Sequence, residues 1–252
     1  MMRVGAYQCA AGRVDPQTRL DQLRAQAAGL DLLVCPELFL SGYTPASAKL
    51  AEPQGGPFGQ AVARIARDAG TAIAYGYPEK DGACVYNAAA LYDAHGRLLA
   101  NHRKTIMAPG SFEHAAFARG RGLTFADLGG WRVAMIICYE VEFPEILRAA
   151  ARQGAALIIV PTALGADWGV VAERVVPTRA FENGVWIVYA DHAGAAEGLR
   201  FYGGSTIAGP DGTRHAAATG RPALITAEID RASVARLQAR LPYLKDCKEL
   251  TC

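Results

Sequence analysis

Short apolar runs of strand length alternate with longer helical runs along this 252-residue chain, and this alternation limits the possible folds more than any other feature. The first third reads as strand, helix, strand, helix and strand, over residues 3–9, 16–28, 32–35, 58–69 and 71–77. Proline in the first turn of the first helix and Gly70 after the second are typical helix boundaries. Strands that alternate with helices predict an α/β fold.

The middle of the chain reads as hairpins instead. Predicted strands over 85–92 and 97–103 flank a turn-rich connection, and strands over 123–128 and 131–138 flank Gly129 and Gly130. Alternation then returns, with helices over 142–153, over 167–183 and from Asp230, and strands over 156–160, 185–189, 204–208 and 223–228. This order predicts a layered α/β sandwich, with a sheet or sheets under helices and a ligand site at the C-terminal ends of strands.

Length, composition and charge narrow the class of protein. We expect a single domain over residues 1–252, with 230–252 a helix and tail that serve packing or dimer contact. The content of 51% hydrophobic residues excludes a disordered chain, and a net charge of +2 without any Lys/Arg run argues against nucleic-acid or membrane partners. No signal-peptide core opens the chain, and no apolar run reaches the roughly 20 residues of a membrane span. We therefore expect a cytoplasmic protein.

The cysteines are scattered rather than paired. They stand at positions 9, 35, 84, 138, 247 and 252, without the C-x2-C spacing of a zinc site, so we expect no metal and mostly buried thiols. A redox or metal-binding protein is thus a rival interpretation that the spacing disfavours. Cys247 and Cys252 lie in a polar tail, where a disulfide, a metal contact and free thiols all stay open.

Glu37 is the first candidate for chemistry, because it follows the buried strand 32–35 and Pro36. A carboxylate among apolar neighbours at a sheet edge has a raised pKa and can exchange protons near neutral pH, as a general base must. A solvated loop residue or a helix cap is the alternative interpretation of the same position.

Lys104 is the second candidate, at the end of the hairpin strand 97–103 and one of only five lysines in the chain. Its compact positive charge could stabilise a developing oxyanion, and Glu113, nine residues later, could orient the ammonium group. Both side chains could also be simple surface groups.

Cys138 is the third candidate. An apolar strand runs directly into this cysteine, and a helix with Pro144 in its first turn begins shortly afterwards. Such a strand-to-helix turn resembles a nucleophile elbow, where helix N–H groups favour a thiolate and the amide of Tyr139 can bind an oxyanion. A buried structural cysteine is the alternative.

Glu37, Lys104 and Cys138, in this order and each at a strand end, resemble the nitrilase or carbon–nitrogen hydrolase superfamily, whose catalytic set is Glu-Lys-Cys with a second Glu. The similarity covers nearly the whole chain, in blocks that keep the family order: PELFLSGY (36–43), YNAA (86–89), HRKT (102–105), CYEVEFPE (138–145), PTA (161–163) and RAFEN (179–183). The resemblance implies a four-layer α-β-β-α sandwich that dimerises into an eight-layer assembly through helices, one of them the helix after the cysteine.

The resemblance also implies roles for these residues. Cys138 would be the nucleophile and Glu37 the base, Lys104 and the Tyr139 N–H would hold the oxyanion, and Glu113 would match the second glutamate. No cofactor or metal is expected.

Residues near the nucleophile favour amide hydrolysis within the superfamily. Members that act on carbamoyl amino acids or dicarboxylic ω-amides commonly carry Arg there, where this chain has Val141, Glu142 and Phe143. True nitrilases typically have Trp where this chain has Tyr139. We therefore expect an amidase, of the aliphatic or stereoselective kind, that releases ammonia from small neutral or aminated carboxamides. An N-carbamoyl hydrolase or ω-amidase is the alternative, and a nitrilase or a non-catalytic binding module is less expected.

The substrate pocket is implied to include Tyr43, Glu142, Thr162 and Ala163. Glu142 either faces this pocket and attracts a substrate amine or caps the following helix, and we favour the cap. Glu140 stands where Asp is usual, a change that could alter the pocket width. His192 either lines the pocket or is a solvated loop residue, and we favour the latter.

Overall fold

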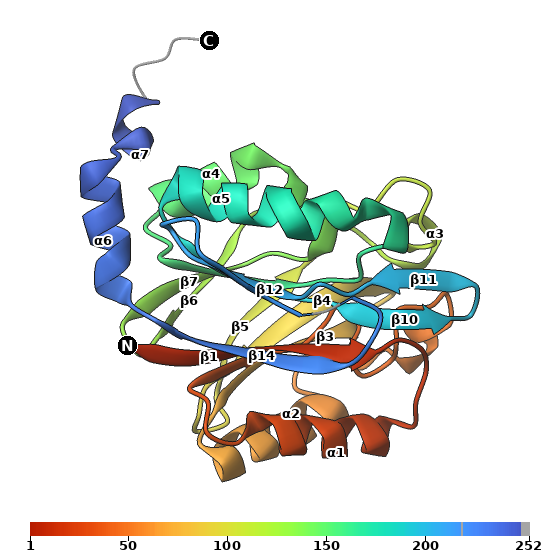
Figure 1. Ribbon diagram of the computed structural model, residues 1–252. Helices are drawn as coiled ribbons and strands as arrows, with labels where there is room; N and C mark the ends of the chain where they lie inside the picture. The colour runs from red at the N-terminus through yellow and green to blue at the C-terminus, as the bar shows by residue number, and fades with distance from the viewer. Residues whose placement is uncertain (218, 248–252) are drawn as a thin grey trace.

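Two β-sheets lie face to face, with helices outside each, in the computed structural model, which describes residues 1–217 and 219–247 (Figure 1). The first sheet has the strand order β11, β10, β1, β2, β3, β4 and β5, and β14 also pairs with β1. Its strands are β1 (Met2–Ala10), β2 (Leu32–Val34), β3 (Ala72–Asp81), β4 (Cys84–Tyr92), β5 (Leu98–Arg103), β10 (His192–Ala196), β11 (Leu199–Tyr202) and β14 (Ala223–Ile229). Because β1, β2 and β3 are parallel, their C-terminal ends meet at one edge.

The second sheet has the order β13, β12, β9, β8, β7 and β6. Its strands are β6 (Thr124–Leu128), β7 (Trp131–Met135), β8 (Leu157–Pro161), β9 (Trp186–Ala190), β12 (Thr206–Ala208) and β13 (Arg214–Ala216). Strands β7, β8 and β9 are parallel, which gives the second sheet its own edge of C-terminal ends.

Helices cover the outer faces of both sheets (Figure 1). The first sheet carries α1 (Pro16–Ala27) and α2 (Pro57–Ala69), and the second carries α4 (Pro144–Arg152) and α5 (Val176–Asn183). Three apolar clusters fill the three interfaces, one between the sheets and one under each helix pair. These layers confirm the predicted α-β-β-α sandwich.

The α2 helix shows how the sequence specifies one of these interfaces. Val62, Ile65 and Ala66 recur at helical spacing and are buried against the first sheet, and each large apolar side chain contributes about 1.5–3 kcal/mol on burial. Gly70 ends the helix with φ of 65°, in the left-handed region that glycine adopts most easily, as its position predicted.

The predicted helix over 167–183 is confirmed as helical, but it is not one continuous α-helix. The segment consists of a 3-10 turn (Ala166–Trp168), a π-helical turn (Val171–Val175) and α5. Pro177 is the physical reason, because its ring clashes with the carbonyl four residues earlier and its nitrogen has no hydrogen to donate. The Val176 N–H therefore donates to the Val171 carbonyl five residues back, which widens the helix.

Three strands of the structure were not predicted. Strands β10 and β11 form a hairpin over a stretch rich in alanine and glycine, residue types with little strand preference, and β13 is a three-residue edge strand. The predicted strand 131–138 also ends early, at Met135, and a 3-10 helix (Cys138–Glu142) precedes α4.

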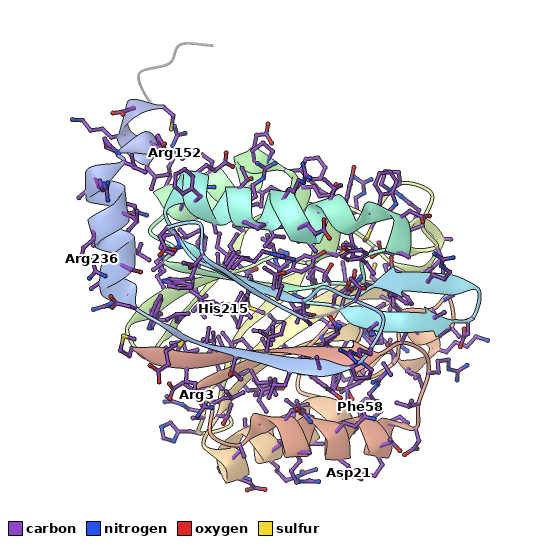
Figure 2. All side chains as sticks on the ribbon, in the orientation of Figure 1. Arg3, Asp21, Phe58, Arg152, His215 and Arg236 are labelled. Carbon is purple, nitrogen blue, oxygen red and sulfur yellow. The ribbon has the colours of Figure 1, made fainter. Side chains whose placement is uncertain are left out.

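The C-terminal part of the described chain lies beside the sandwich (Figure 1). There α6 (Arg231–Arg240) begins after Asp230, whose side chain accepts a hydrogen bond from the Ala232 N–H, and α7 (Tyr243–Asp246) follows. Side chains fill the space between the layers, whereas Asp21 on α1 and Arg236 on α6 point away from them (Figure 2). Within residues 1–217 and 219–247, no helix combines the length and hydropathy needed to cross a membrane.

Candidate active site

The predicted catalytic residues come from the ends of strands in both sheets. Glu37 follows β2, Lys104 follows β5, Glu113 opens α3 (Glu113–Ala116) and Cys138 follows β7. The Glu37 N–H donates to the Thr162 carbonyl at the end of β8, at 3.3 Å, and so joins the loops of the two sheets. Residues far apart in the chain therefore meet at one end of the sandwich.

Lys104 bridges two glutamates in the interior. Its Nζ lies 2.7 Å from Glu37 Oε1, 2.7 Å from Glu113 Oε1 and 2.8 Å from Glu113 Oε2, and all three side chains are 0% exposed. Asn87 Nδ2 donates to the same two carboxylates, at 2.6 Å to Glu37 and 2.7 Å to Glu113. All three ammonium hydrogens of Lys104 therefore donate to carboxylate oxygens.

The electrostatics of this cluster set its protonation. Burial raises the pKa of Glu37 to about 7, against the lowering effect of the Lys104 ammonium. Burial would also raise the pKa of Glu113, but Lys104 outweighs burial and lowers it below the ordinary value. Lys104 itself stays charged, because the nearby acidic groups overcome burial and raise its pKa. Glu113 is therefore a fixed anion, while Glu37 can exchange a proton near neutral pH.

One carboxylate oxygen of Glu37 has no hydrogen-bond partner among the described residues and can accept a proton. Glu37 Oε1 accepts from Lys104 and Asn87, whereas Glu37 Oε2 is buried and has no hydrogen-bond partner among the described residues. A buried acceptor without a partner is costly and rare in proteins, and in an active site it marks a position that substrate or a reacting proton will fill.

Cys138 sits in a strained turn. Its φ of 51° lies in the left-handed region, which costs a non-glycine residue about 1–3 kcal/mol and is typical of functional positions. The residue is 8% exposed. Its thiol lies near enough to Glu37, Lys104 and Glu113 for their charges to influence its pKa. The turn has the character of the predicted nucleophile elbow.

The resting site favours the thiol form of Cys138 rather than the thiolate that the sequence led us to expect. Burial raises the pKa of the Cys138 thiol well above its usual range, and the Glu37 and Glu113 carboxylates add to this effect despite Lys104. The α4 helix begins only at Pro144, too far along the chain for its dipole to dominate. The thiol therefore needs a base to remove its proton.

Glu140 ties the cysteine turn to the lysine strand. Its carboxylate accepts from the Ile137 N–H at 2.6 Å, from the Thr105 N–H at 2.7 Å, and from the Thr105 hydroxyl, and it pairs with His102 Nε2 at 2.9 Å. These partners flank Cys138 and Lys104. Glu140 is 1% exposed and is not part of the cavity wall, so it acts as a structural link between the two loops.

A cavity of about 320 Å³ opens onto the sulfur. Its lining residues are Tyr43, Ala108, Pro109, Cys138, Tyr139, Glu142, Ala163, Leu164, Gly165 and Trp168. Three of the four residues expected in the pocket, Tyr43, Glu142 and Ala163, are in this wall. Thr162 lies behind it, fully buried, with its hydroxyl 3.1 Å from Tyr189 Oη.

The structure does not support the helix-cap interpretation of Glu142. Phe143 holds the N-cap position of α4, no side chain caps it, and the acidic residue of the first turn is Glu145. Glu142 is half-buried in the cavity wall instead.

The chain matches the carbon–nitrogen hydrolase family model over residues 5–239. It belongs to the carbon–nitrogen hydrolase family. A Pseudomonas protegens protein named "Hydrolase in pqqF 5'region" is 44% identical, over 97% of this chain and 88% of the relative. An (R)-stereoselective amidase from Pseudomonas sp. is 33% identical, over 90% of this chain and 83% of the relative.

Solved structures of family members agree with the fold. The NitN amidase of Nesterenkonia sp. AN1 is 36% identical to this carbon–nitrogen hydrolase, with a TM-score of 0.85 over 98% of this chain and 100% of that one. Two further structures of that amidase show acrylamide, and the acetamide moiety of fluoroacetamide, added covalently at its active-site cysteine. The chain is thus an enzyme that hydrolyses C–N bonds, with the nitrilase-like fold that its motifs predicted.

Sequence reasoning missed three polar residues that support the hydrolase site. Asn87 was quoted only as part of a family block. His192 was expected in solvent or in the pocket, but it is fully buried, and its Nε2 donates to the Glu37 carbonyl at 2.7 Å. Burial lowers the pKa of His192 to about 4, so it acts as a neutral donor. Asp191 accepts from the Leu164 N–H at 2.8 Å and so holds the cavity wall.

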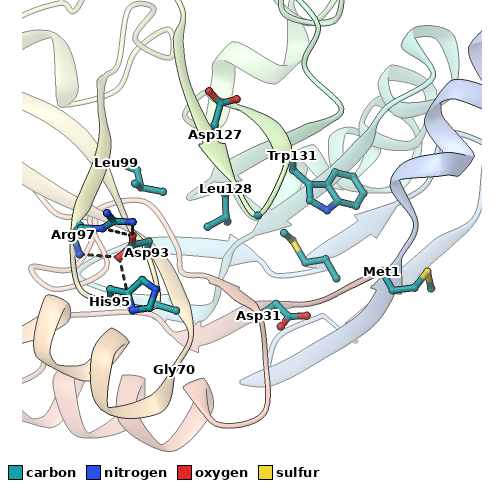
Figure 3. Close-up of a pocket in the computed structure, with 13 residues that line it drawn as sticks. Met1, Asp31, Gly70, Asp93, His95, Arg97, Leu99, Asp127, Leu128 and Trp131 are labelled. Carbon is teal, nitrogen blue, oxygen red and sulfur yellow. Dashed lines mark hydrogen bonds and ion pairs between the residues drawn. The ribbon is translucent and has the colours of Figure 1, made fainter.

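A second cavity, of about 400 Å³, lies at the opposite end of the strands (Figure 3). Two of its three acidic side chains make hydrogen bonds: Asp93 accepts from Arg97 Nε at 2.8 Å, and Asp31 accepts from the Arg3 N–H at 2.7 Å. The third, Asp127, lies 4.0 Å from Arg132 Nη1. This second cavity holds no cysteine, so we place the hydrolase site at the other end.

The other cysteines that the structure describes make no hydrogen bond to Glu37, Lys104 or Glu113. Cys9 and Cys35 are buried, Cys84 is exposed, and Cys247 is a free thiol 2.9 Å from Arg152 Nη2. Cys252 lies outside the described residues. In residues 1–217 and 219–247, no group of three or more His, Cys, Asp or Glu is placed to hold a metal ion.

Gly76 allows the Glu37 loop to approach β3. A Cβ at this position would lie 2.3 Å from Leu38 N and 2.7 Å from Glu37 Cα. Gly76→Ala should therefore displace the base, and we expect kcat to fall by about 100-fold, the usual effect of a 1 Å misplacement. Steady-state hydrolysis of a simple carboxamide measures this.

Gly5→Ala is the matched control, because this strand glycine would meet only leucine side-chain atoms, the nearest being Leu30 Cδ1 at 2.6 Å. It should leave kcat within about twofold while it lowers stability by about 1–3 kcal/mol. An equal loss of kcat in both variants would contradict a specific role of Gly76 under the base.

Proposed function

We propose that this hydrolase converts small non-anionic carboxamides into the carboxylic acid and ammonia, through a thioester on Cys138. The observation that carries the proposal is the buried Oε2 of Glu37, which has no partner among the described residues. Glu37 is paired with the Lys104 ammonium, and both lie within electrostatic reach of the Cys138 thiol in the cavity wall. The named amidase relatives and the covalent adducts on the Nesterenkonia cysteine support it.

In the first half-reaction Glu37 takes the thiol proton as the sulfur attacks the amide carbonyl carbon. The C–N bond then breaks, Glu37 returns the proton to the leaving nitrogen, and ammonia departs to leave a thioester. In the second half-reaction Glu37 removes a proton from water, the oxygen attacks the thioester, and the proton returns to the sulfur as the acid leaves. No other co-reactant is needed.

Lys104 and the Tyr139 N–H would stabilise the oxyanion of each tetrahedral intermediate. In the resting site all three Lys104 hydrogens are bound by carboxylates. When Glu37 gains a proton, its negative charge disappears and its hold on Lys104 weakens. An ammonium hydrogen thereby becomes available at the moment when the oxyanion forms. Glu113 stays ionised and keeps Lys104 charged and in place.

The cavity wall disfavours the alternative substrates with a carboxylate. A Xenopus laevis ω-amidase is 29% identical over 90% of this chain, so this activity occurs among the relatives. No arginine or lysine is part of the cavity wall described here, and its one ionisable carboxyl group is that of Glu142. A panel of amide, carbamoyl and nitrile substrates, assayed for ammonia and for carbon dioxide, separates these activities.

The pH dependence of the reaction should report Glu37. A general base works only when deprotonated, and the pKa of Glu37 is raised to about 7. We expect kcat/KM for a neutral amide to fall as the pH is lowered through about 7, and to level off above it. Initial rates across the pH range measure this, with Glu37→Gln as the variant that should lose activity at every pH. A profile that is flat through this range would rule out Glu37 as the base.

The homodimer, the single-domain organisation and the cytoplasmic location stay predictions. Two partly exposed aromatic residues could contribute to a dimer contact. Phe181 on α5 is 38% exposed, and Tyr243 on α7 is 39% exposed. Their rings contact each other, with 6.1 Å between the centroids.

A further inference from the structure

Glu142 is the charged side chain of the active-site cavity. The other lining residues are aromatic, apolar or glycine, apart from the Cys138 nucleophile. A lone carboxylate therefore sets the electrostatic character of the space that the substrate must enter. An arriving positive charge is attracted there and a negative charge is repelled.

The Glu142 carboxylate has no cationic partner of its own. No hydrogen bond or ion pair ends on its oxygens within the described part of the chain. The neighbouring cation, Arg179, makes no hydrogen bond or ion pair with the Glu142 carboxylate among the described residues. Its Nη1 pairs with Glu182 Oε1 at 3.0 Å, its Nη2 donates to the Glu142 main-chain carbonyl at 2.9 Å, and its Nε is buried without a hydrogen-bond partner in the described chain. Burial raises the pKa of Glu142 even with Arg179 nearby, so the side chain is partly desolvated without full compensation.

Aromatic side chains share this wall with Glu142. Trp168 is 64% exposed, an unusual condition for an indole, and Tyr139 is also part of the lining. Aromatic faces attract organic cations, with Trp the strongest, and are used with carboxylates to bind ammonium groups.

The spacing along the chain indicates where such a cation would lie. Cys138 and Glu142 are the ends of one 3-10 helix, whose rise of about 2 Å per residue separates their Cα atoms by about 8 Å along the axis. A group that contacts Glu142 is therefore several bonds away from a carbonyl carbon at the sulfur.

We propose that Glu142 binds an ammonium group on the substrate, so that the preferred substrates are small carboxamides with a terminal amine separated from the amide by several methylene groups. This rests on the proposed amidase function and names its substrate class. Glu142 is thereby a specificity-determining residue. The same carboxylate rejects ω-amides that end in a carboxylate.

The test compares three amides of equal length that differ only in the terminal group: amine, hydroxyl and carboxylate. Each is measured as a series with two to five methylene groups, on the wild type and on Glu142→Gln. The wild type should prefer the amine, and Glu142→Gln should raise KM for the amine by about tenfold or more, the usual effect of removing a charged partner. KM for the hydroxyl amide should change much less than KM for the amine, and the carboxylate amide should improve.

Glu145→Gln is the matched control. It makes the same chemical change three residues away, at an exposed position outside the cavity, and should leave all three substrates unchanged.

The outcomes separate this inference from the proposed function. If the wild type hydrolyses the hydroxyl amide as well as the amine at every length, or if Glu142→Gln changes both KM values alike, the ammonium site is overturned while the amidase function stands. If the wild type hydrolyses none of the amides, both are overturned.

Discussion

Cys138→Ala should abolish carboxamide hydrolysis, with kcat reduced by about 10⁴-fold or more, as for other enzymes that lose a covalent nucleophile. Alanine removes the only atom that can form the thioester, and water cannot replace it in a site built around a buried thiol. Ammonia release under substrate saturation measures the effect.

Two controls belong with this variant. Thermal unfolding should show a folded protein, because alanine removes only the sulfur atom and introduces no steric clash. Cys84→Ala, which changes an exposed thiol on β4, should keep wild-type activity. Residual turnover in Cys138→Ala within about 100-fold of the wild type would show that another group is the nucleophile.

Lys104→Met should cause the second large effect, on both activity and stability. The variant loses a positive charge at the oxyanion, which costs about 10²–10³-fold in kcat. It also leaves Glu37 and Glu113 facing each other in the interior, where breaking a buried ion pair costs about 3–5 kcal/mol. Urea unfolding and steady-state kinetics measure the two losses.

The stability loss in Lys104→Met should depend on pH in a defined direction. Without the ammonium group, burial and mutual repulsion hold the carboxyl pKa values above those of the unfolded chain. A group whose pKa is raised in the folded state stabilises at low pH, and this stabilisation is lost as the pH rises. The variant should therefore lose more stability, relative to the wild type, at about pH 8 than at about pH 5.

Lys80→Met, at an exposed position of β3, is the control and should change neither property. A Lys104→Met protein as stable as the wild type at both pH values would contradict the buried three-residue cluster.

The sequence was sufficient to predict the layers of the fold and to select strand-end residues that the structure brings close together. The strand runs before Glu37 and Cys138, and the hairpin before Lys104, place each side chain at a strand end. Parallel strands bring such ends to one edge of a sheet. The order of these residues then pointed to the family that the comparisons show.

The supporting polar contacts could not be predicted in the same way. Asn87 and His192 reach Glu37 across 50 and 155 positions of the chain, and no local pattern encodes such a pairing. The protonation of Cys138 was mispredicted for a related reason. Burial and two carboxylates from distant segments raise the pKa of its thiol, and the local sequence does not reveal them.

The helix and strand assignments that differ from the prediction depend on contacts with neighbouring segments as well as on the local sequence. Pro177 falls inside the predicted helix 167–183 and forces a π-turn before α5. Strand β10 forms from residues with little strand preference because β1 provides a parallel partner on one side and β11 an antiparallel partner on the other.

The most direct test of the central claim is to trap the covalent intermediate on the wild-type enzyme. The enzyme is mixed with a carboxamide substrate, quenched with acid during turnover, and analysed by intact mass and peptide mapping. We predict a mass increase equal to the acyl group, located on Cys138 and released by hydroxylamine as expected for a thioester. An acyl group found on any other residue, or steady turnover without acylation of Cys138, would contradict the proposed mechanism.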